Sequence, residues 1–181
     1  TSPVVGKLGQ GLKFDGVNQY VSKTSFPYYA TVSACAWIKD LQGGSHATYR
    51  AILSHHTTNT VASDWYFYWV PSDSKLHVDI PWNTNDVVVS NITITDLATT
   101  WHHVCFTRAG TIGSWTYSVF IDGVNRGSNT TAANPAGNSE TLEAAAFGNS
   151  SHYTRENLDD VRIYNRALSA GEVSQLYNSG R

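Results

Sequence analysis

Leu158-Asp-Asp-Val-Arg-Ile-Tyr164 is the stretch of sequence that decides the fold. Neighbouring side chains of a β-strand point to opposite faces, so the alternation predicts a strand with Val161 and Ile163 on the core face and Asp160 on the other. Such a strand can line the interior of a two-sheet sandwich. We expect it to pair near the N-terminal strand and to bring the two chain ends together, as in a jelly roll.

Short strand-like runs recur outward from this stretch, separated by turn signals such as Asp122-Gly123, which favours a hairpin. This pattern is typical of an all-β sandwich or barrel. Segment 128–141 is rich in Asn, Thr, Ala and Gly, and is predicted to be a long loop. The other predicted strands are residues 11–14, 20–22, 32–39, 51–55, 65–70, 75–80, 86–94, 101–108, 116–121 and 143–148.

One short helix is predicted near the C-terminus, over residues 169–177. Ser169 is the expected N-cap, and Glu172, three residues later, completes a capping box. The expected fold class is therefore all-β: a two-sheet antiparallel jelly-roll sandwich with one short C-terminal helix.

The length of 181 residues suits one domain, so we expect a single unit over residues 1–181. Charged residues make up only 14% of the chain, while Trp and Tyr number 6 and 10, a composition that favours strands. The N-terminus, Thr1-Ser2-Pro3, lacks an initiator Met and a signal-peptide pattern. We therefore expect the chain to be a piece of a longer protein.

The charge pattern bears on the partner. The net charge is −2, and the 12 Lys and Arg residues are scattered, so the chain has no basic surface for a phosphate backbone. No apolar run approaches the roughly 18 residues needed to span a bilayer. We expect neither nucleic-acid binding nor membrane insertion.

The two cysteines, Cys35 and Cys105, each lie in the middle of a strand-like run. They could form a disulfide if the two strands are neighbours. The alternative is a pair of buried thiols, because Cys is among the most buried residue types.

Several blocks of sequence occur in a characteristic order: Gly11-Leu-Lys-Phe-Asp-Gly16, Tyr20-Val21, Val32-Ser-Ala-Cys-Ala-Trp-Ile-Lys39, Trp101-His-His-Val104, Val119-Phe-Ile-Asp-Gly123 and Leu158-Asp-Asp-Val-Arg-Ile-Tyr-Asn-Arg-Ala-Leu-Ser169. Together they cover nearly the whole chain. They resemble the laminin-G-like domains of the concanavalin A-like lectin and glucanase superfamily. The cysteine positions are similar to those of pentraxins, and this resemblance favours the disulfide. A disulfide would imply a secreted or cell-surface protein.

The resemblance also implies a structural Ca²⁺ on Asp15, Gly16 and Asp160. Carboxylates and backbone carbonyls are the hard oxygen ligands that Ca²⁺ prefers, although it needs 6–8 of them. In the alternative, Asp15 only caps its own turn, and Asp160 pairs with Arg162 or Lys13.

The run from Trp65 to Val70 is aromatic at nearly every position, although only one of its faces can belong to the core. If Val70 and Leu76 both face the core, the other face carries flat aromatic rings beside polar groups, as in sugar sites. In the alternative, a loop over residues 43–50 covers this strand. The predicted carbohydrate-binding residues are Trp65, Phe67, Trp69, His77, Asp79 and Trp82.

Two other groups are weaker candidates. His55-His56 and His102-His103 are adjacent pairs, and neighbours on a strand point apart, so neither pair is expected to bind one metal. His152, Tyr153 and Arg155 lie just before the last strand, where they could form a rim that contacts a ligand.

Catalysis is not expected. Glycosidases need two carboxylates at a defined separation, and among the glutamates only Glu140 and Glu143 are close in sequence. We therefore predict a non-catalytic module that binds a glycan or polysaccharide, attached to other domains of a secreted or cell-surface protein. The alternatives are a protein-binding adhesion module of laminin-G type and a structural spacer.

Overall fold

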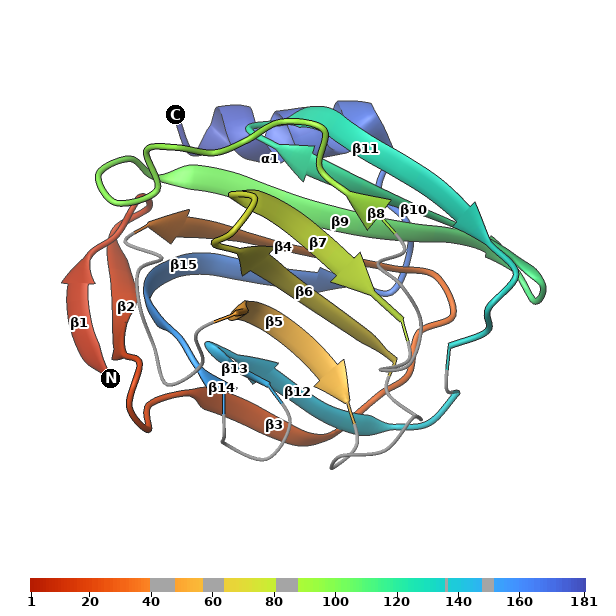
Figure 1. Ribbon diagram of the computed structural model, residues 1–181, viewed down its shortest axis with the longest axis horizontal. Helices are drawn as coiled ribbons and strands as arrows, with labels where there is room; N and C mark the ends of the chain where they lie inside the picture. Colours follow the sequence, from red (N-terminus) through yellow and green to blue (C-terminus); the bar gives the residue numbers. More distant parts are fainter. Residues whose placement is uncertain (40–47, 57–63, 81–87, 136, 148–151) are drawn as a thin grey trace.

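The computed structural model describes residues 1–39, 48–56, 64–80, 88–135, 137–147 and 152–181. Two antiparallel sheets lie face to face and enclose the core, with a single helix outside them in the described part (Figure 1). This arrangement confirms the predicted all-β two-sheet sandwich.

The seven-stranded sheet brings the C-terminal strand into its interior, between an N-terminal strand and the strand that carries Cys35. The predicted pairing of the last strand near the N-terminal one is therefore correct. In spatial order this sheet contains β1 (Ser2–Val5), β2 (Gln10–Asp15), β15 (Arg155–Tyr164), β4 (Val32–Lys39), β9 (His102–Thr111), β10 (Ser114–Ile121) and β11 (Val124–Thr131).

The six-stranded sheet carries the aromatic run of the sequence at its centre. A small two-stranded sheet, β13 (Ala146–Phe147) with β14 (His152–Tyr153), accompanies it. In spatial order the six strands are β3 (Val21–Phe26), β12 (Glu140–Ala144), β5 (Arg50–His56), β6 (Trp65–Val70), β7 (Lys75–Asp79) and β8 (Val88–Val89).

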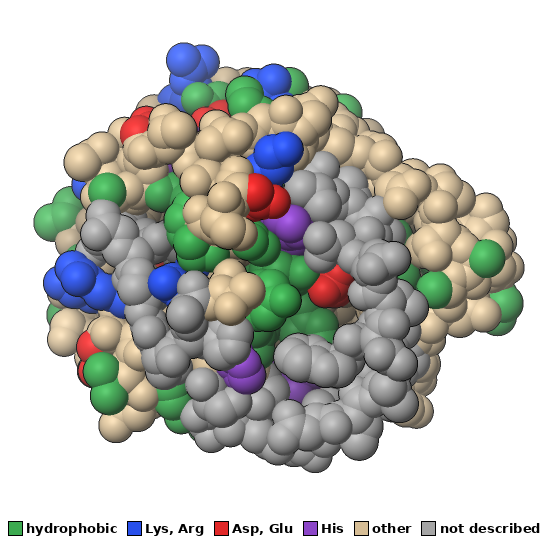
Figure 2. Space-filling view, in the orientation of Figure 1, with side chains coloured by type: hydrophobic (Ala, Val, Ile, Leu, Met, Phe, Trp, Pro, Cys, Tyr) green, Lys and Arg blue, Asp and Glu red, His purple; other side chains and the backbone are tan. Residues whose placement is uncertain are grey.

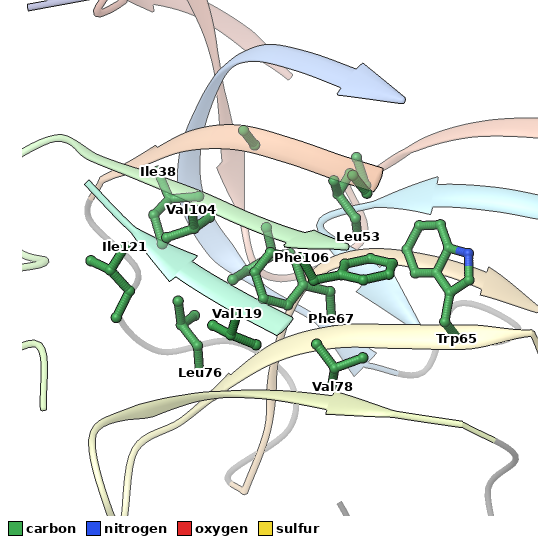
Figure 3. Packing of buried hydrophobic residues seen from close by; sticks show 14 of the residues in the cluster. Ile38, Leu53, Trp65, Phe67, Leu76, Val78, Val104, Phe106, Val119 and Ile121 are labelled. Atoms are coloured by element: carbon green, nitrogen blue, oxygen red, sulfur yellow. The ribbon is translucent and has the colours of Figure 1, made fainter. Parts of the chain in front are cut away.

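The core between the sheets is built from aliphatic and aromatic side chains of both (Figure 3). Trp65 and Phe67 of one sheet contact Phe106 of the other, with ring centroids 4.9 and 5.5 Å apart. Aromatic pairs at these distances add stabilisation beyond the burial of their area.

Strand β15 contains a bulge that corrects part of the prediction. The register with β4 shifts between Asp159 and Arg162, and Asp160 has φ 47°. A bulge adds a residue and re-aims the side chains beyond it. As a result Ile163 packs against the core as expected, but Val161 is 42% exposed and does not.

The predicted loop over residues 128–141 begins too early, because residues 128–131 form the second half of strand β11. Its polar side chains pair across the hairpin that begins at Asp122-Gly123: Thr116 Oγ1 lies 2.9 Å from Thr130 Oγ1, and Ser118 Oγ lies 2.7 Å from Ser128 Oγ. Cross-strand hydroxyl pairs stabilise a strand without apolar alternation.

The cysteines form the predicted disulfide. Cys35 and Cys105 lie directly opposite each other on β4 and β9, and both are fully buried. Helix α1 (Ala170–Ser179) covers them, and Val173 packs into the same cluster. In the described residues no helix has the length and hydropathy to cross a membrane.

The capping box that begins α1 is present as predicted. Ser169 Oγ accepts the backbone N–H of Glu172, and the Glu172 carboxylate accepts the backbone N–H of Ser169 at 2.8 Å. The arrangement satisfies two N–H groups that a helix start would leave without a partner.

A buried ion pair between Arg108 and Asp64 connects a loop to the sheets. Arg108 donates to both carboxylate oxygens of Asp64 and to the carbonyl oxygen of Ala30. His55 Nδ1 lies 3.0 Å from the same carboxylate. All three side chains are buried, so their charges and polar atoms depend on one another for partners.

Candidate functional site

The face that each residue of β6 presents follows from the β6–β7 hairpin. Trp69 lies opposite Leu76, and Val70 lies opposite Lys75. The expectation that Val70 and Leu76 share a face was wrong, because residues directly opposite each other share one. A difference of one position exchanges the two faces of a whole strand.

The residues predicted to face solvent therefore line the core instead. Trp65 is 2% exposed and Phe67 is 0% exposed, and both point into the interior in Figure 3. Trp69 is partly buried and packs against the same core. Their interior position means that they do not form the predicted carbohydrate platform.

His77 and Asp79 were assigned correctly to the outer face. They lie opposite Tyr68 and Tyr66, so the outward aromatic residues of β6 are these two tyrosines. Trp82, the last predicted member of the platform, lies outside the described residues.

An aromatic pocket lies on the outer face of the six-stranded sheet. The described residues that line it are Tyr49, Tyr66, Tyr68, Asp79 and Phe147. Its volume is about 90 Å³. Figure 2 shows a hollow over β5–β7 with hydrophobic side chains at its floor and acidic and histidine side chains beside them.

The rings of the aromatic pocket are set at right angles to one another. Phe147 meets Tyr66 and Tyr68 at centroid distances of 5.2 and 5.5 Å and interplanar angles of 89° and 84°. Tyr49 meets Tyr68 at 5.3 Å and 83°. Edge-to-face contacts are favourable and hold the walls in place.

Polar contacts orient the rings from behind. Tyr68 Oη donates to Asp79 Oδ2 at 2.8 Å. The His77 ring stacks on Tyr68 at 5.4 Å, and His77 Nε2 lies 2.9 Å from Asp73 Oδ2. The pocket thus has one carboxylate whose position is fixed by a phenol.

A second polar pair lies along the same face. His56 Nε2 lies 3.0 Å from Glu143 Oε2, and the His56 ring stacks on Tyr66 at 5.9 Å and 13°. Glu143, Ser54, Tyr66 and Asp79 are successive partners across β12, β5, β6 and β7. Because neighbouring strands are about 4.8 Å apart, the backbones at Glu143 and Asp79 are separated by roughly 14 Å.

Tyr49 and Phe147 were missed as site residues. The alternative prediction, in which a loop over residues 43–50 covers β6, is confirmed in part, because Tyr49 packs on Tyr68. Residues 43–47 lie outside the described residues. Tyr66 and Tyr68 are only 5% and 4% exposed as a result of such packing. No sequence pattern indicated Phe147 as a site residue, because it reaches the site from the short strand β13.

The three residues of the predicted rim, His152, Tyr153 and Arg155, do not lie together. His152 lies opposite Phe147, with ring centroids 6.3 Å apart, so it borders the aromatic pocket. Tyr153 instead contacts Tyr20 at 5.8 Å, and Arg155 lies opposite Asp15 in the other sheet.

Asp15 caps its own turn. Its Oδ1 accepts the backbone N–H of Val17 at 2.9 Å, and this bond lowers the pKa of Asp15. The turn continues through Gly16, whose φ of 76° is readily adopted by glycine.

Asp160 does not lie close to Asp15. Asp15 lies opposite Arg155, and Asp160 is five positions further along β15, on the order of 15 Å away. Asp160 Oδ1 instead accepts from Arg162 Nε at 2.8 Å. Among the described residues no group of three or more His, Cys, Asp or Glu could hold a metal ion. Asp15, Gly16 and Asp160 therefore do not fit a shared calcium site.

The adjacent histidines have separate partners. His55 faces Asp64 in the interior, whereas His56 pairs with Glu143 outside it. His102 bridges Asp96 and Asp122. Burial lowers the pKa of its neighbour His103 to about 4.

The comparison with protein families gives one match across most of the chain. The model described as "Concanavalin A-like lectin/glucanases superfamily", of laminin G type, matches residues 15–174. Among curated proteins no sequence matches the chain.

Solved structures share the fold at low identity. A heptameric pentraxin from Limulus polyphemus has a TM-score of 0.68 and 17% identity, covering 92% of this chain and 78% of its own. Domain 4 of an extracellular arabinanase from Geobacillus stearothermophilus, in complex with arabinotriose, has a TM-score of 0.68 and 17% identity, covering 97% and 80%. The binding domain of a Paraclostridial mosquitocidal protein has 0.69 and 18%, covering 98% and 45%.

Proposed function

Because this chain belongs to the concanavalin A-like lectin/glucanases superfamily, we propose that it is a non-catalytic carbohydrate-binding domain and that its site is the aromatic pocket. The observation that carries the proposal is the composition of this pocket, in which four aromatic rings surround one carboxylate. Rings cover the apolar C–H face of a sugar, and a carboxylate accepts hydrogen bonds from hydroxyl groups.

The structural neighbours support a glycan as the ligand. One of them is an arabinanase domain in complex with arabinotriose. At 17% identity that likeness concerns the fold, so the residues of this chain must supply the argument for function. The aromatic pocket supplies it through Tyr66, Tyr68 and Asp79 on adjacent strands.

The partners of the two carboxylates support binding over hydrolysis. Glycosidases use two carboxyl groups as acid and as base or nucleophile. In the row that crosses the site, Asp79 accepts a hydrogen bond from Tyr68 Oη, and Glu143 Oε2 lies 3.0 Å from His56 Nε2. Both acidic residues of the row are therefore engaged by neighbouring side chains.

The disulfide supports an extracellular location. Cys35 and Cys105 are bonded, and structural disulfides persist mainly in oxidising compartments. A secreted or surface-attached domain meets polysaccharides directly, which agrees with a binding role.

Retention on a panel of immobilised glycans and polysaccharides tests the proposal. We expect retention of the wild-type domain on at least one glycan and its loss in Tyr68→Ala. Tyr20→Ala is the matched control, since it removes a tyrosine that contacts Tyr153 and does not line the pocket. Circular dichroism of each variant verifies folding.

Two outcomes would overturn the proposal. One is a wild-type domain that no glycan retains, which would favour the protein-binding alternative. The other is a folded Tyr68→Ala variant that is retained as well as the wild type, which would show that the site lies elsewhere.

A further inference from the structure

The size of the aromatic pocket restricts what part of a glycan can enter it. Pockets for whole small molecules have volumes of roughly 300–1,000 Å³. The aromatic pocket has about 90 Å³. It is therefore large enough for one substituent of a sugar and too small for a whole sugar ring.

The charge of the pocket restricts the chemistry of that substituent. Asp79 is the one charged residue among the five that line the pocket in the described structure. Tyr68 Oη donates a hydrogen bond to Oδ2 of this carboxylate at 2.8 Å, which fixes its position in the pocket. An anionic substituent would be repelled, whereas a cationic one would be attracted.

The rings add to this preference. A cation is attracted to the face of an aromatic ring, and cages of several rings are a known means of binding ammonium groups. Phe147 stands at right angles to both Tyr66 and Tyr68, and Tyr49 stands at right angles to Tyr68. Rings with these orientations border the same small volume from several directions.

We infer that the pocket takes the protonated amino group of an amino sugar. The inference rests on the proposed function and specifies it: the preferred ligand is an oligosaccharide with unsubstituted amino sugars. Asp79 pairs with the ammonium group, and the rings of Tyr49, Tyr66 and Phe147 surround it.

Calorimetric titration with two oligosaccharides of equal length tests the inference, one built of glucosamine and one of N-acetylglucosamine. The acetyl group removes the positive charge and enlarges the substituent. We expect the acetylated ligand to bind about tenfold more weakly or worse, the size of a single desolvated cation–π and ion-pair contribution.

A variant separates charge from shape. Asp79→Asn keeps the size of the side chain and removes its charge, so we expect the loss of affinity to be about tenfold larger for the glucosamine ligand than for neutral glycans. Asp15→Asn is the matched control, since it removes one negative charge from an exposed turn and should leave both affinities unchanged.

The outcomes distinguish this inference from the proposed function. If neutral glycans bind as tightly as the glucosamine ligand, or Asp79→Asn weakens both kinds of ligand equally, the inference is overturned and the carbohydrate site stands. If no glycan binds the folded wild-type domain, both are overturned.

Discussion

Removing the disulfide should cost the domain several kcal/mol of stability. Cys35 and Cys105 are 70 residues apart in the sequence. For a closed loop of that length the chain-entropy relation gives about 4.4 kcal/mol at 25 °C, mainly because the cross-link restricts the unfolded chain. We therefore expect Cys35→Ala/Cys105→Ala to lower the free energy of unfolding by about 4 kcal/mol.

Urea unfolding followed by tryptophan fluorescence measures this loss. With a slope of about 2 kcal/mol per M of urea, the midpoint should fall by roughly 2 M. The variant also loses packing beneath α1, where Cys35 and Cys105 belong to one buried cluster with Val173 and Phe120. The wild-type domain unfolded under reducing conditions separates the two effects, because it lacks the bond and keeps the side chains.

A small loss of stability would show that the cross-link does not restrict the unfolded chain as expected. If the reduced wild type and the variant both lose less than about 1 kcal/mol, the unfolded chain is already compact around these residues. If only the variant loses stability, packing under the helix is the cause and the cross-link is not.

Four further predictions follow from the buried groups and the site. Arg108→Met should lower the free energy of unfolding by about 3–5 kcal/mol, because it leaves the Asp64 carboxylate buried without its charged partner; a loss under 1 kcal/mol in a urea melt would contradict this. Burial raises the pKa of Glu156 well above its usual value, so the folded state keeps this proton to a higher pH than the unfolded chain, and stability falls as pH rises above about 4.5. Glu156→Gln should therefore gain stability relative to the wild type between pH 5 and pH 8, and a pH-independent difference between the two urea midpoints would speak against it. Tyr68→Phe removes the hydrogen bond to Asp79 and should weaken glycan binding about tenfold with the fold retained; calorimetry showing equal affinities would exclude a role for that bond. Asp15→Asn should shift the thermal midpoint by the same amount with and without EDTA, since Asp15 and Asp160 lie apart, and a difference between the two shifts would reveal a metal bound by Asp15.

Much of the fold was predictable because it depends on local patterns. The capping box at Ser169 and the Asp122-Gly123 turn are set by residues a few positions apart, and both are present. Neither feature depends on distant segments. The pairing of the last strand with β2 does join distant segments, and it was expected from the jelly-roll arrangement.

The orientation of β6 was not predictable in the same way. A strand with aromatic residues at nearly every position has no period of two, so its faces must be inferred from the neighbouring strand. The pairing of Val70 with Lys75 decides them, and it depends on the conformation of the turn over residues 71–74. The face on which Val161 lies was not predictable either, because it depends on the bulge in β15.

The pocket was predictable only in part. His77 and Asp79 alternate with apolar neighbours, so their outward position follows from β7 itself. Tyr49 and Phe147 come from segments about a hundred residues apart, and only the folded chain brings them together. A pocket assembled from such distant parts has no signature in one stretch of sequence.

The disulfide and the aromatic pocket belong to different sheets, with the core between them. The covalent link and the helix that covers it secure β4 and β9, whereas the ligand is expected to meet β6 and β7. Random variation restricted to the outer face of β6 and β7 would therefore explore new specificities while the cross-linked sheet maintains the fold. Such a division would let recognition diverge faster than architecture.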